Sequence, residues 1–302
     1  MGSNWRRSAG VSEDLTELDS DGVRSDSVSR ETPLPRPERT RVIVIANQKG
    51  GVGKTTTTVN LAAALGLGGL SVLVVDADPQ GNASTALGVD HRQGIRGTYE
   101  TLMDGDDMAW HVQVSAETPG LTVLPSTIDL AAAELELVAV PGRERRLADA
   151  LAAYLAVQPV DYVLIDCPPS LGLLTLNALV AAGEIMIPIQ CEYYALEGVS
   201  QLMRTIDLVR GDLNPDLALS TVLLTMYDGR TRLSAQVAEE VRRYFPDQAL
   251  ETVIPRSVRI AEAPSYGRSV LTYHRESAGA RAYAAAAVEM ARRGAPTGAN
   301  QT

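Results

Sequence analysis

Two lysines and three glycines immediately follow the first apolar run of the chain. Residues 42–47 lead directly into Gln48-Lys49-Gly50-Gly51-Val52-Gly53-Lys54-Thr55-Thr56. Glycines allow the tight turn that points consecutive backbone N–H groups at an anion, and the N-terminus of a following helix adds free amides and a positive dipole end. Lys54 can then reach the β- and γ-phosphates of a nucleotide, and the Thr55 hydroxyl can ligate Mg²⁺. The segment therefore predicts a phosphate-binding loop.

The loop departs from the common pattern G-x-x-x-x-G-K-[ST], because Gln48 stands where the first glycine would be. The chain has 27 Lys and Arg residues, and the only lysines among them are Lys49 and Lys54. Arginine and lysine are not interchangeable in shape or hydration. Two lysines five residues apart, in a chain that otherwise uses arginine, indicate a chemical requirement at both positions.

Three aspartates follow two other apolar runs and could serve the same phosphates. Asp76 and Asp78 come at and just after the end of residues 71–76, and Asp166 ends residues 161–166. An apolar strand that delivers a carboxylate beside a phosphate loop is how P-loop enzymes hold hydrated Mg²⁺. Aspartate also caps turns and helices, which is the structural alternative for each residue alone. In company with the phosphate loop, we interpret Asp166 as the metal-associated carboxylate.

These side chains require a sheet whose strand ends meet at one edge. Short runs rich in Val, Ile and Leu alternate with Ala-rich helical stretches, which predicts one α/β domain over residues 41–294 with a doubly wound, mostly parallel sheet and helices on both faces. Ligands bind beyond the carboxyl ends of such strands. We expect strands at residues 42–47, 71–76, 121–125, 161–166, 184–190, 217–226 and 250–254. We expect helices at residues 54–67, 127–139, 143–157, 172–182, 196–211, 232–245 and 278–293.

Composition excludes several classes of protein. The chain has 302 residues, 45% of them hydrophobic, which is ordinary for a globular protein and enough for a sizeable core. It has no apolar run near the ~18 residues of a membrane span and no apolar signal segment at its start. Two cysteines, Cys167 and Cys191, are too few for a disulfide framework. We therefore expect a cytoplasmic protein without a membrane partner.

The two ends and the charge distribution add further expectations. Residues 1–40 and 295–302 are polar and show no sustained period, which predicts disordered tails; the partner of the first tail, if it has one, is not indicated. The formal charge is −10 overall, made of −2 in residues 1–40, −12 in residues 41–229 and +4 in residues 230–302. The last quarter is thus locally basic in an acidic chain, although a mixed solvated surface would also give this pattern.

The run from Lys49 to Thr56 resembles the deviant Walker A motif of the ParA/Soj partition ATPases and their relatives, which include MinD and the nitrogenase iron protein. The segments that begin at Ile165 (IDCPPSLG), Cys191 (CEYYALEG), Thr225 (TMYDGRT) and Val253 (VIPRSVRIAEAPS) are similar to those of Soj-type chromosome partition proteins, and the resemblance covers nearly all of residues 41–290. It implies a P-loop ATPase of the deviant Walker A type that uses ATP and Mg²⁺ and forms a homodimer when ATP is bound.

The resemblance also implies roles for single residues. Lys49 reaches the phosphates bound by the other subunit, Lys54 acts within its own subunit, and Gly50 lies where the two protomers approach. Asp78 orients the attacking water, and Asp76 is an active-site carboxylate close to the metal. The full implied nucleotide set is Lys49, Gly50, Gly51, Val52, Gly53, Lys54, Thr55, Thr56, Pro255 and Ser257, with Thr55, Asp76 and Asp166 at the metal.

For partners, the resemblance implies non-specific binding of the ATP-bound dimer to double-stranded nucleoid DNA, and weak hydrolysis that a ParB/Spo0J-type protein stimulates. Arg230 and Arg259 match the family's DNA-contact positions. Weaker candidates nearby are Arg232, Arg242, Arg243, Arg256 and Arg268, for which a solvated surface charge is an equally good interpretation. The chain does not indicate whether it serves a chromosome or a plasmid, although residues 1–40 leave no room for a helix-turn-helix domain.

Three alternatives stay open at this stage. A MinD-like membrane-cycling ATPase would need a bulky apolar helix at its C-terminus, whereas residues 280–293 offer mostly alanine. An iron–sulfur carrier would need cysteines that two subunits share, and Cys167 and Cys191 are better interpreted as buried small residues. A metabolite ligase or kinase would need an acceptor pocket, which the sequence does not reveal.

Overall fold

The computed structural model describes residues 33–193 and 195–295. Most of the first predicted tail and residues 296–302 of the second lie outside the described residues. The described residues form one sheet of eight strands in the order β3-β4-β2-β5-β1-β6-β7-β8. All neighbouring strands run parallel except β3 and β4. The predicted doubly wound, mostly parallel α/β sheet is confirmed.

The strands other than β3 agree with the predicted apolar runs to within two residues at each end. They are β1 (Arg41–Ile45), β2 (Val72–Asp76), β3 (Gln113–Val114), β4 (Leu121–Leu124), β5 (Tyr162–Asp166), β6 (Glu184–Gln190), β7 (Ala218–Tyr227) and β8 (Ala249–Pro255). β1, β2 and β5 are buried almost throughout because helices cover both faces of the sheet.

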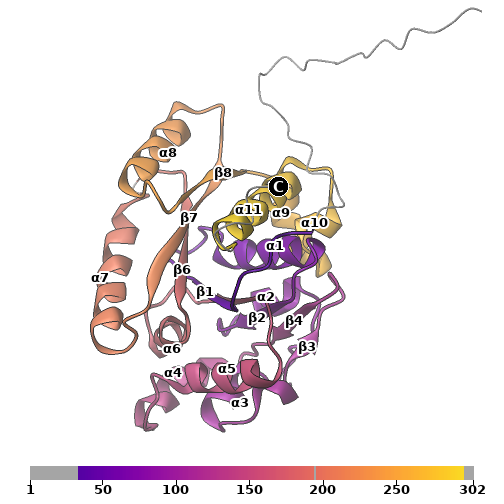
Figure 1. Ribbon diagram of the computed structural model, residues 1–302, viewed down its shortest axis with the longest axis vertical. Coiled ribbons are helices and arrows are strands. Elements are labelled where there is room, and N and C mark those ends of the chain that lie inside the picture. The colour runs from indigo at the N-terminus through magenta and orange to yellow at the C-terminus, as the bar shows by residue number, and fades with distance from the viewer. Residues whose placement is uncertain (1–32, 194, 296–302) are drawn as a thin grey trace, which may run out of the picture. The chain divides into compact units, whose positions relative to one another are not determined.

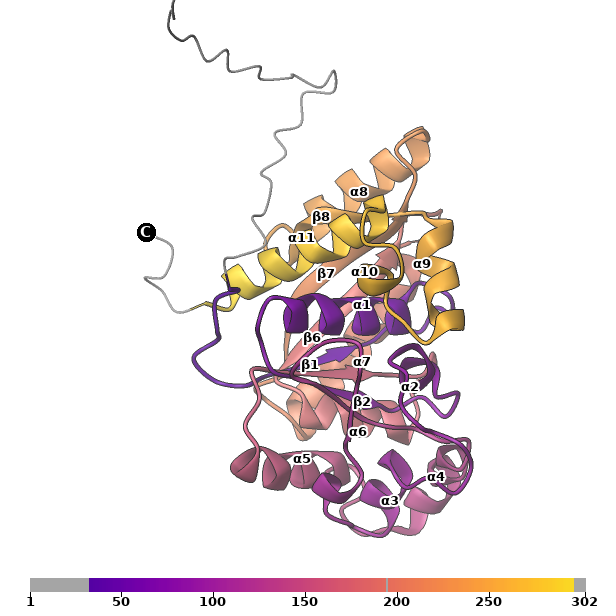
Figure 2. The same ribbon diagram turned by 90° about the vertical axis from the view of Figure 1, so that its right-hand side faces the viewer.

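Helices cover both faces of this sheet. One core contains residues of α3 (Thr98–Met103), α4 (Leu130–Glu136), α5 (Arg146–Val157), α6 (Leu173–Ala181), α7 (Glu197–Asp212) and α8 (Arg232–Tyr244). The other core contains residues of α1 (Lys54–Leu67), α2 (Asn82–Ala86), α9 (Val258–Glu262), α10 (Val270–Tyr273) and α11 (Ala278–Arg293). Figure 1 labels these elements, and Figure 2 shows α1 beside α11 on one side of the strands and α5 on the other.

Short elements account for the main differences from the predicted secondary structure. The sequence pattern did not predict α2, α3, α9 and α10, which have four to six residues, or the two-residue β3. Helical periodicity needs more than two turns to be visible. The predicted helix 127–139 begins three residues later than expected, as α4, and its last three residues form a 3₁₀ turn at Leu137–Ala139.

The segment of residues 33–40, the described part of the predicted first tail, packs on the domain. The Leu34 amide donates to the Gly68 carbonyl at 2.9 Å, and its side chain packs on the second core. The Thr40 hydroxyl donates to the Val160 carbonyl at 2.6 Å. The partly buried Leu34 side chain and these hydrogen bonds offset the entropy of ordering a short polar segment.

Strand register sets the position of the functional side chains. Asp166 of β5 lies beside Asp76 of β2 on one side and Ile45 of β1 on the other. The chain after Ile45 therefore leaves the sheet beside two carboxylates. Among the described residues, no helix combines the length and the apolar character needed to cross a bilayer.

Candidate phosphate-binding site

The loop between β1 and α1 has the backbone shape that an anion requires. Gly51 and Gly53 have φ values of 75° and 92°, a region that residues with a Cβ rarely adopt. Gly53 precedes α1 without a side-chain cap, and the first turn of α1 contains no acidic residue. A Cβ added at Gly50 or Gly51 would meet no atom within 4 Å. The loop therefore leaves space beside Gly50 and Gly51 at the positive end of α1, which fits a phosphate group.

Two side chains, one beside the loop and one from β7, hold this loop in place. The Asn47 amide donates to the Pro188 carbonyl at 2.8 Å and accepts from the Lys49 amide at 3.0 Å. The Thr225 hydroxyl, near the end of β7, donates to the Val52 carbonyl at 2.8 Å. The loop is thus fixed to β6 and β7 by bonds that involve none of its phosphate-facing amides.

The two lysines lie in different environments. Lys54 is 7% exposed, and this burial lowers the pKa of its ammonium although Asp166 and Asp78 attract the charged form. The Lys49 side chain is 41% exposed, and its nearest ionic partner is Glu192 at 3.8 Å. The Lys54 ammonium is thus shielded from solvent near two carboxylates, whereas the Lys49 ammonium is open to solvent.

Asp166 lies against the start of α1 and is completely buried. Its Oδ2 accepts a hydrogen bond from the Thr55 hydroxyl at 2.6 Å, and its Oδ1 accepts one from the Thr58 hydroxyl at 3.1 Å. Burial, with the nearby charge of Asp76 as the second cause, raises the pKa of Asp166 to about 8. The Thr55 and Asp166 oxygens lie together beside the loop, as P-loop proteins need at Mg²⁺.

Asp76 and Asp78 organise the segment after β2. The Asp76 Oδ2 accepts from the Ser84 amide at 2.8 Å and hydroxyl at 2.7 Å, and its Oδ1 accepts from the Asp78 amide at 3.2 Å. Burial raises the pKa of Asp76 to about 7. Asp78 is 7% exposed and accepts from the Gln80 amide at 3.0 Å. Asp76 therefore fixes the turn that presents Asp78.

Replacing Asp166 with asparagine is expected to weaken the pH dependence of stability. The carboxyl groups of Asp76 and Asp166 both have folded-state pKa values above the usual value near 4. They therefore favour the folded state at low pH, and this contribution to stability is lost as the pH rises through about 7 to 8. We expect the free energy of unfolding, measured by urea titration with a chelator, to fall between pH 6 and pH 9 by roughly 2 kcal/mol or more.

The Asp166→Asn protein should show a smaller fall over the same range, because one of the two buried charges is gone. Asparagine keeps an acceptor for one threonine hydroxyl, so the comparison isolates charge from packing. An equally steep pH dependence in the variant would contradict the assignment of the effect to Asp166.

Pro255 and Ser257 lie at the carboxyl end of β8, at the same edge of the sheet as the loop. Pro255 is the last residue of β8 and pairs in register with Tyr227, and Ser257 precedes α9. Both are half-buried. Among the described residues, no hydrogen bond joins either of them to the phosphate loop, so their place in the nucleotide-binding set stays a prediction.

The seven predicted DNA-contact arginines are all exposed, and most are paired with acidic groups. Arg230 makes a two-pronged contact with Asp228 at 2.9 and 2.8 Å, and Arg259 contacts Glu262 at 2.9 Å. Three of the weaker candidates also have partners. Arg256 pairs with Glu192 and Arg243 with Glu239, whereas Arg242 donates to the backbone carbonyl of Glu251. No side-chain partner is seen for Arg232 or Arg268 within the described ranges.

The two cysteines are buried and unpaired. Burial raises the pKa of the Cys191 thiol to about 11 and that of Cys167 well above its ordinary value. Among the described residues, no group of three or more His, Cys, Asp or Glu side chains could hold a metal. Inaccessible thiols argue against a cluster shared between subunits, whereas Mg²⁺ suits the site because nucleotide phosphates and water supply most of its ligands.

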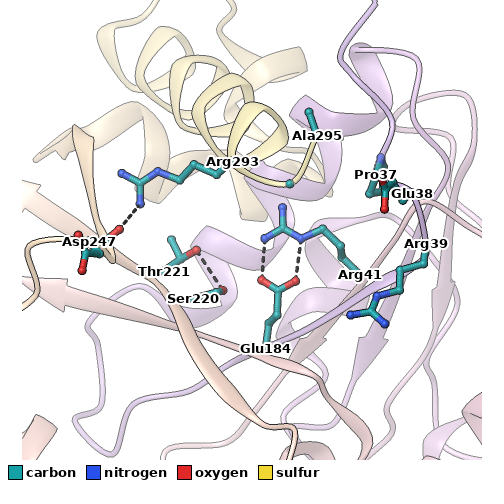
Figure 3. Close-up of a pocket in the computed structure, with 11 residues that line it drawn as sticks. Pro37, Glu38, Arg39, Arg41, Glu184, Ser220, Thr221, Asp247, Arg293 and Ala295 are labelled. Atoms are coloured by element: carbon teal, nitrogen blue, oxygen red, sulfur yellow. Dashed lines mark hydrogen bonds and ion pairs between the residues drawn. The ribbon is translucent and has the colours of Figure 1, made fainter. Parts of the chain in front are cut away.

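A separate polar pocket of about 600 Å³ lies at the opposite, amino ends of the strands. Two of its arginines bind other lining residues: Arg41 forms a two-pronged contact with Glu184 at 2.7 and 2.6 Å, and Arg293 donates to the Asp247 backbone carbonyl at 3.0 Å. Figure 3 shows these contacts across the pocket. The pocket therefore lies away from the phosphate loop and provides no acceptor site beside it.

Several side chains at the site were not singled out from the sequence. Thr58 and Ser84 bind the two buried carboxylates, and Asn47 and Thr225 fix the loop. Asn47 directly precedes the loop motif, and Thr58 follows Lys54 by one helical turn, so the sequence could have indicated that both residues lie at the site. For Ser84 and Thr225 the contacts depend on the tertiary fold.

Comparison with known proteins gives consistent matches. The family model described as AAA domain matches residues 40–219. The chain is 54% identical to the chromosome partitioning protein ParA of Caulobacter vibrioides NA1000 over 80% of this chain and 91% of that one. It is 52% identical to the sporulation initiation inhibitor protein Soj of Bacillus subtilis 168 over 84% of this chain and 99% of that one.

Among solved structures, one of the similar ones is named cobyrinic acid a,c-diamide synthase from Mycobacterium smegmatis, with bound ADP and magnesium. The TM-score is 0.72 and the identity 40%, over 84% of this chain and 95% of that one.

Proposed function

The chain belongs to the ParA/Soj family of chromosome-partitioning proteins, and from this we propose that it is a switch that ATP turns on and hydrolysis turns off. In the on state, two ATP-bound subunits pair face to face and bind double-stranded DNA without sequence preference. A ParB/Spo0J-type protein stimulates hydrolysis and thereby releases the subunits from DNA. The protein works in the cytoplasm, on the nucleoid.

The observation that carries the ATPase assignment is the contact of Thr55 with Asp166 beside the buried Lys54. The amides of residues 50–55 and the Lys54 ammonium bind the phosphates of ATP. Thr55 and Asp166 hold Mg²⁺, which neutralises phosphate charge when it is bound. Asp78, presented by the turn that Asp76 fixes, orients the attacking water. The solved relative with ADP and magnesium supports this choice of nucleotide and metal.

The contrast between the two lysines supports pairing of subunits. Lys54 is buried in its own site, and the half-exposed Lys49 lies next to open space at Gly50. In the paired form Lys49 extends to the phosphates of the other subunit, and the absence of a side chain at Gly50 allows the close approach. Each site is then complete only when two subunits have met.

Competing functions are disfavoured by specific observations. α11 packs its apolar face, including Tyr283 and Met290, into the core, so that face is not available for a MinD-like membrane helix. A metabolite ligase, suggested by the name of the Mycobacterium relative, requires an acceptor pocket next to the nucleotide. The pocket of Figure 3 lies at the other end of the strands.

DNA binding gives the direct test of the proposed function. We expect strong, salt-sensitive binding to random-sequence duplex DNA with ATP and Mg²⁺, and weak binding with ADP or without nucleotide. Pairing doubles the number of arginine–phosphate contacts, and log K falls by about 0.9 per contact against log salt. Replacing both Arg230 and Arg259 with alanine should make the slope of log K against log salt less steep by about 3.6, because each dimer loses four phosphate contacts.

The matched control is Arg92→Ala. Arg92 pairs with Asp90 two residues earlier at 2.9 and 2.6 Å, which is the same arrangement as that of Arg230 and Asp228. This control should keep the wild-type slope. Failure of the wild-type protein to bind DNA in any nucleotide state would overturn the DNA-binding part of the proposal, and amidation or phosphorylation of small metabolites would be tested next.

A further inference from the structure

Glu192 connects the exposed lysine of the phosphate loop to one of the C-terminal arginines. Its Oε2 lies 3.8 Å from the Lys49 ammonium, and its Oε1 lies 3.0 Å from Nη2 of Arg256. The Gln190 amide also donates to Oε1 at 2.5 Å. The three charged side chains are 41% to 59% exposed, so the cluster is open to a second molecule.

Backbone contacts hold the acid and the arginine at the same edge of the sheet. Glu192 follows β6, where the Cys191 amide donates to the Thr225 carbonyl of β7 at 3.0 Å. Arg256 follows β8, and its amide donates to the Tyr227 carbonyl at 3.0 Å. Lys49 follows β1. The cluster therefore joins the loops after three different strands.

We propose that Glu192 is a positioning residue that keeps Lys49 on its own subunit and so opposes pairing of subunits. Arg256 sets the strength of the ion pair between Glu192 and Lys49. The inference rests on the proposed role of Lys49 at the partner's phosphates. A lysine ammonium is a compact charge on a flexible stem. Both contacts draw on the same ammonium charge, so a contact with Glu192 of its own chain competes with a contact to a phosphate of the partner.

Arg256 weakens the hold of Glu192 on Lys49 because the two cations share one carboxylate. Loss of Arg256 should therefore strengthen the hold and reduce pairing, whereas loss of the Glu192 charge should release Lys49 and increase pairing. After pairing, Glu192 has lost Lys49 and retains Arg256, so we do not expect Arg256 among the DNA contacts of the paired form.

The expected effects are modest because the groups are half-exposed. An exposed ion pair shifts an equilibrium by about 1.5- to 5-fold. Two lysines are released for each dimer, so neutralising Glu192 should tighten the dimer by about 2- to 25-fold.

The experiment measures the dimer dissociation constant of the full chain by analytical ultracentrifugation with a non-hydrolysable ATP analogue and Mg²⁺. Glu192→Gln should dimerise more tightly than wild type, and Arg256→Gln should dimerise more weakly. The double variant should behave as Glu192→Gln alone, because Arg256 has no carboxylate left to share. Asp104→Asn is the matched control: Asp104 is 49% exposed and pairs with Arg96 at 3.2 Å on another element, and its loss should change nothing.

The outcomes separate this inference from the function on which it rests. If the wild-type protein does not dimerise with the analogue, the proposed function fails. If it dimerises and Glu192→Gln is equal to or weaker than wild type, the inference alone is overturned. A purely structural disturbance of the loop would weaken the dimer in both single variants and would add in the double variant, which contradicts the opposite signs expected here.

Discussion

Replacing Lys49 with alanine is expected to abolish ATP-dependent dimerisation while monomeric nucleotide binding remains measurable. The Lys49 side chain is 41% exposed and contributes little to its own site, whereas Lys54 is buried beside Asp166. A hydrogen bond to a charged group contributes about 1.5–3 kcal/mol, and a dimer would lose two of them. The dimer should therefore weaken by about 100-fold or more.

Two measurements check this prediction. Sedimentation in the presence of ATP–Mg²⁺ reports dimerisation, and titration with a fluorescent nucleotide reports nucleotide binding. Lys54→Ala serves as the contrasting variant, since it should lose nucleotide binding itself. A Lys49→Ala protein that dimerises fully and responds to its stimulating partner would rule out a role across the interface. Replacement of Gly50 by a bulky residue should have the same effect on the dimer as Lys49→Ala, because the side chain would enter the space that the partner occupies.

The second large effect is expected at Asp78, where alanine should trap the ATP-bound dimer on DNA. Asp78 is 7% exposed, and its amide donates to the buried Asp76 carboxylate, which Ser84 also binds. In the proposed function its side chain orients the attacking water. Loss of a general base lowers the rate by about 10²- to 10⁴-fold. Hydrolysis in a single turnover should slow by that factor, and dissociation from DNA should slow with it.

Asp78→Asn separates chemistry from the shape of the turn. Asparagine keeps an oxygen for the Gln80 amide but removes the negative charge. Both variants should remain on DNA if the charge is what matters. Rapid release of the Asp78→Ala protein when the ParB/Spo0J-type partner is added would contradict this assignment.

Long elements of the fold could be predicted from the sequence, and short ones could not. The predicted helices 54–67 and 278–293 are confirmed with the same bounds as α1 and α11. Both extend over about four turns and have a clear start or end, such as Ser277 as the N-cap of α11. α2 and α10 are too short for a period and depend on hydrogen bonds such as that from the Val270 amide to Asn60.

The candidate site shows the same division between local and distant information. The loop, its lysines and the strand-end aspartates stand in continuous motifs, so the sequence could indicate them. The contact between Glu192 and Lys49 links residues 143 positions apart and depends on the neighbouring strands β1 and β6. By contrast, the neutralising acid of Arg230 lies two residues away at Asp228, so the local sequence already contained that pair.

The anchoring of the phosphate loop has a consequence for the order of events in time. Asn47 and Thr225 hold the loop through hydrogen bonds that do not involve the backbone amides of residues 50–55, so we expect nucleotide binding to need no prior rearrangement of the backbone. In the proposed cycle, we then expect pairing of two ATP-bound subunits to be slower than nucleotide binding. The expected delay before a subunit binds DNA therefore depends on the local concentration of subunits more than on the supply of ATP.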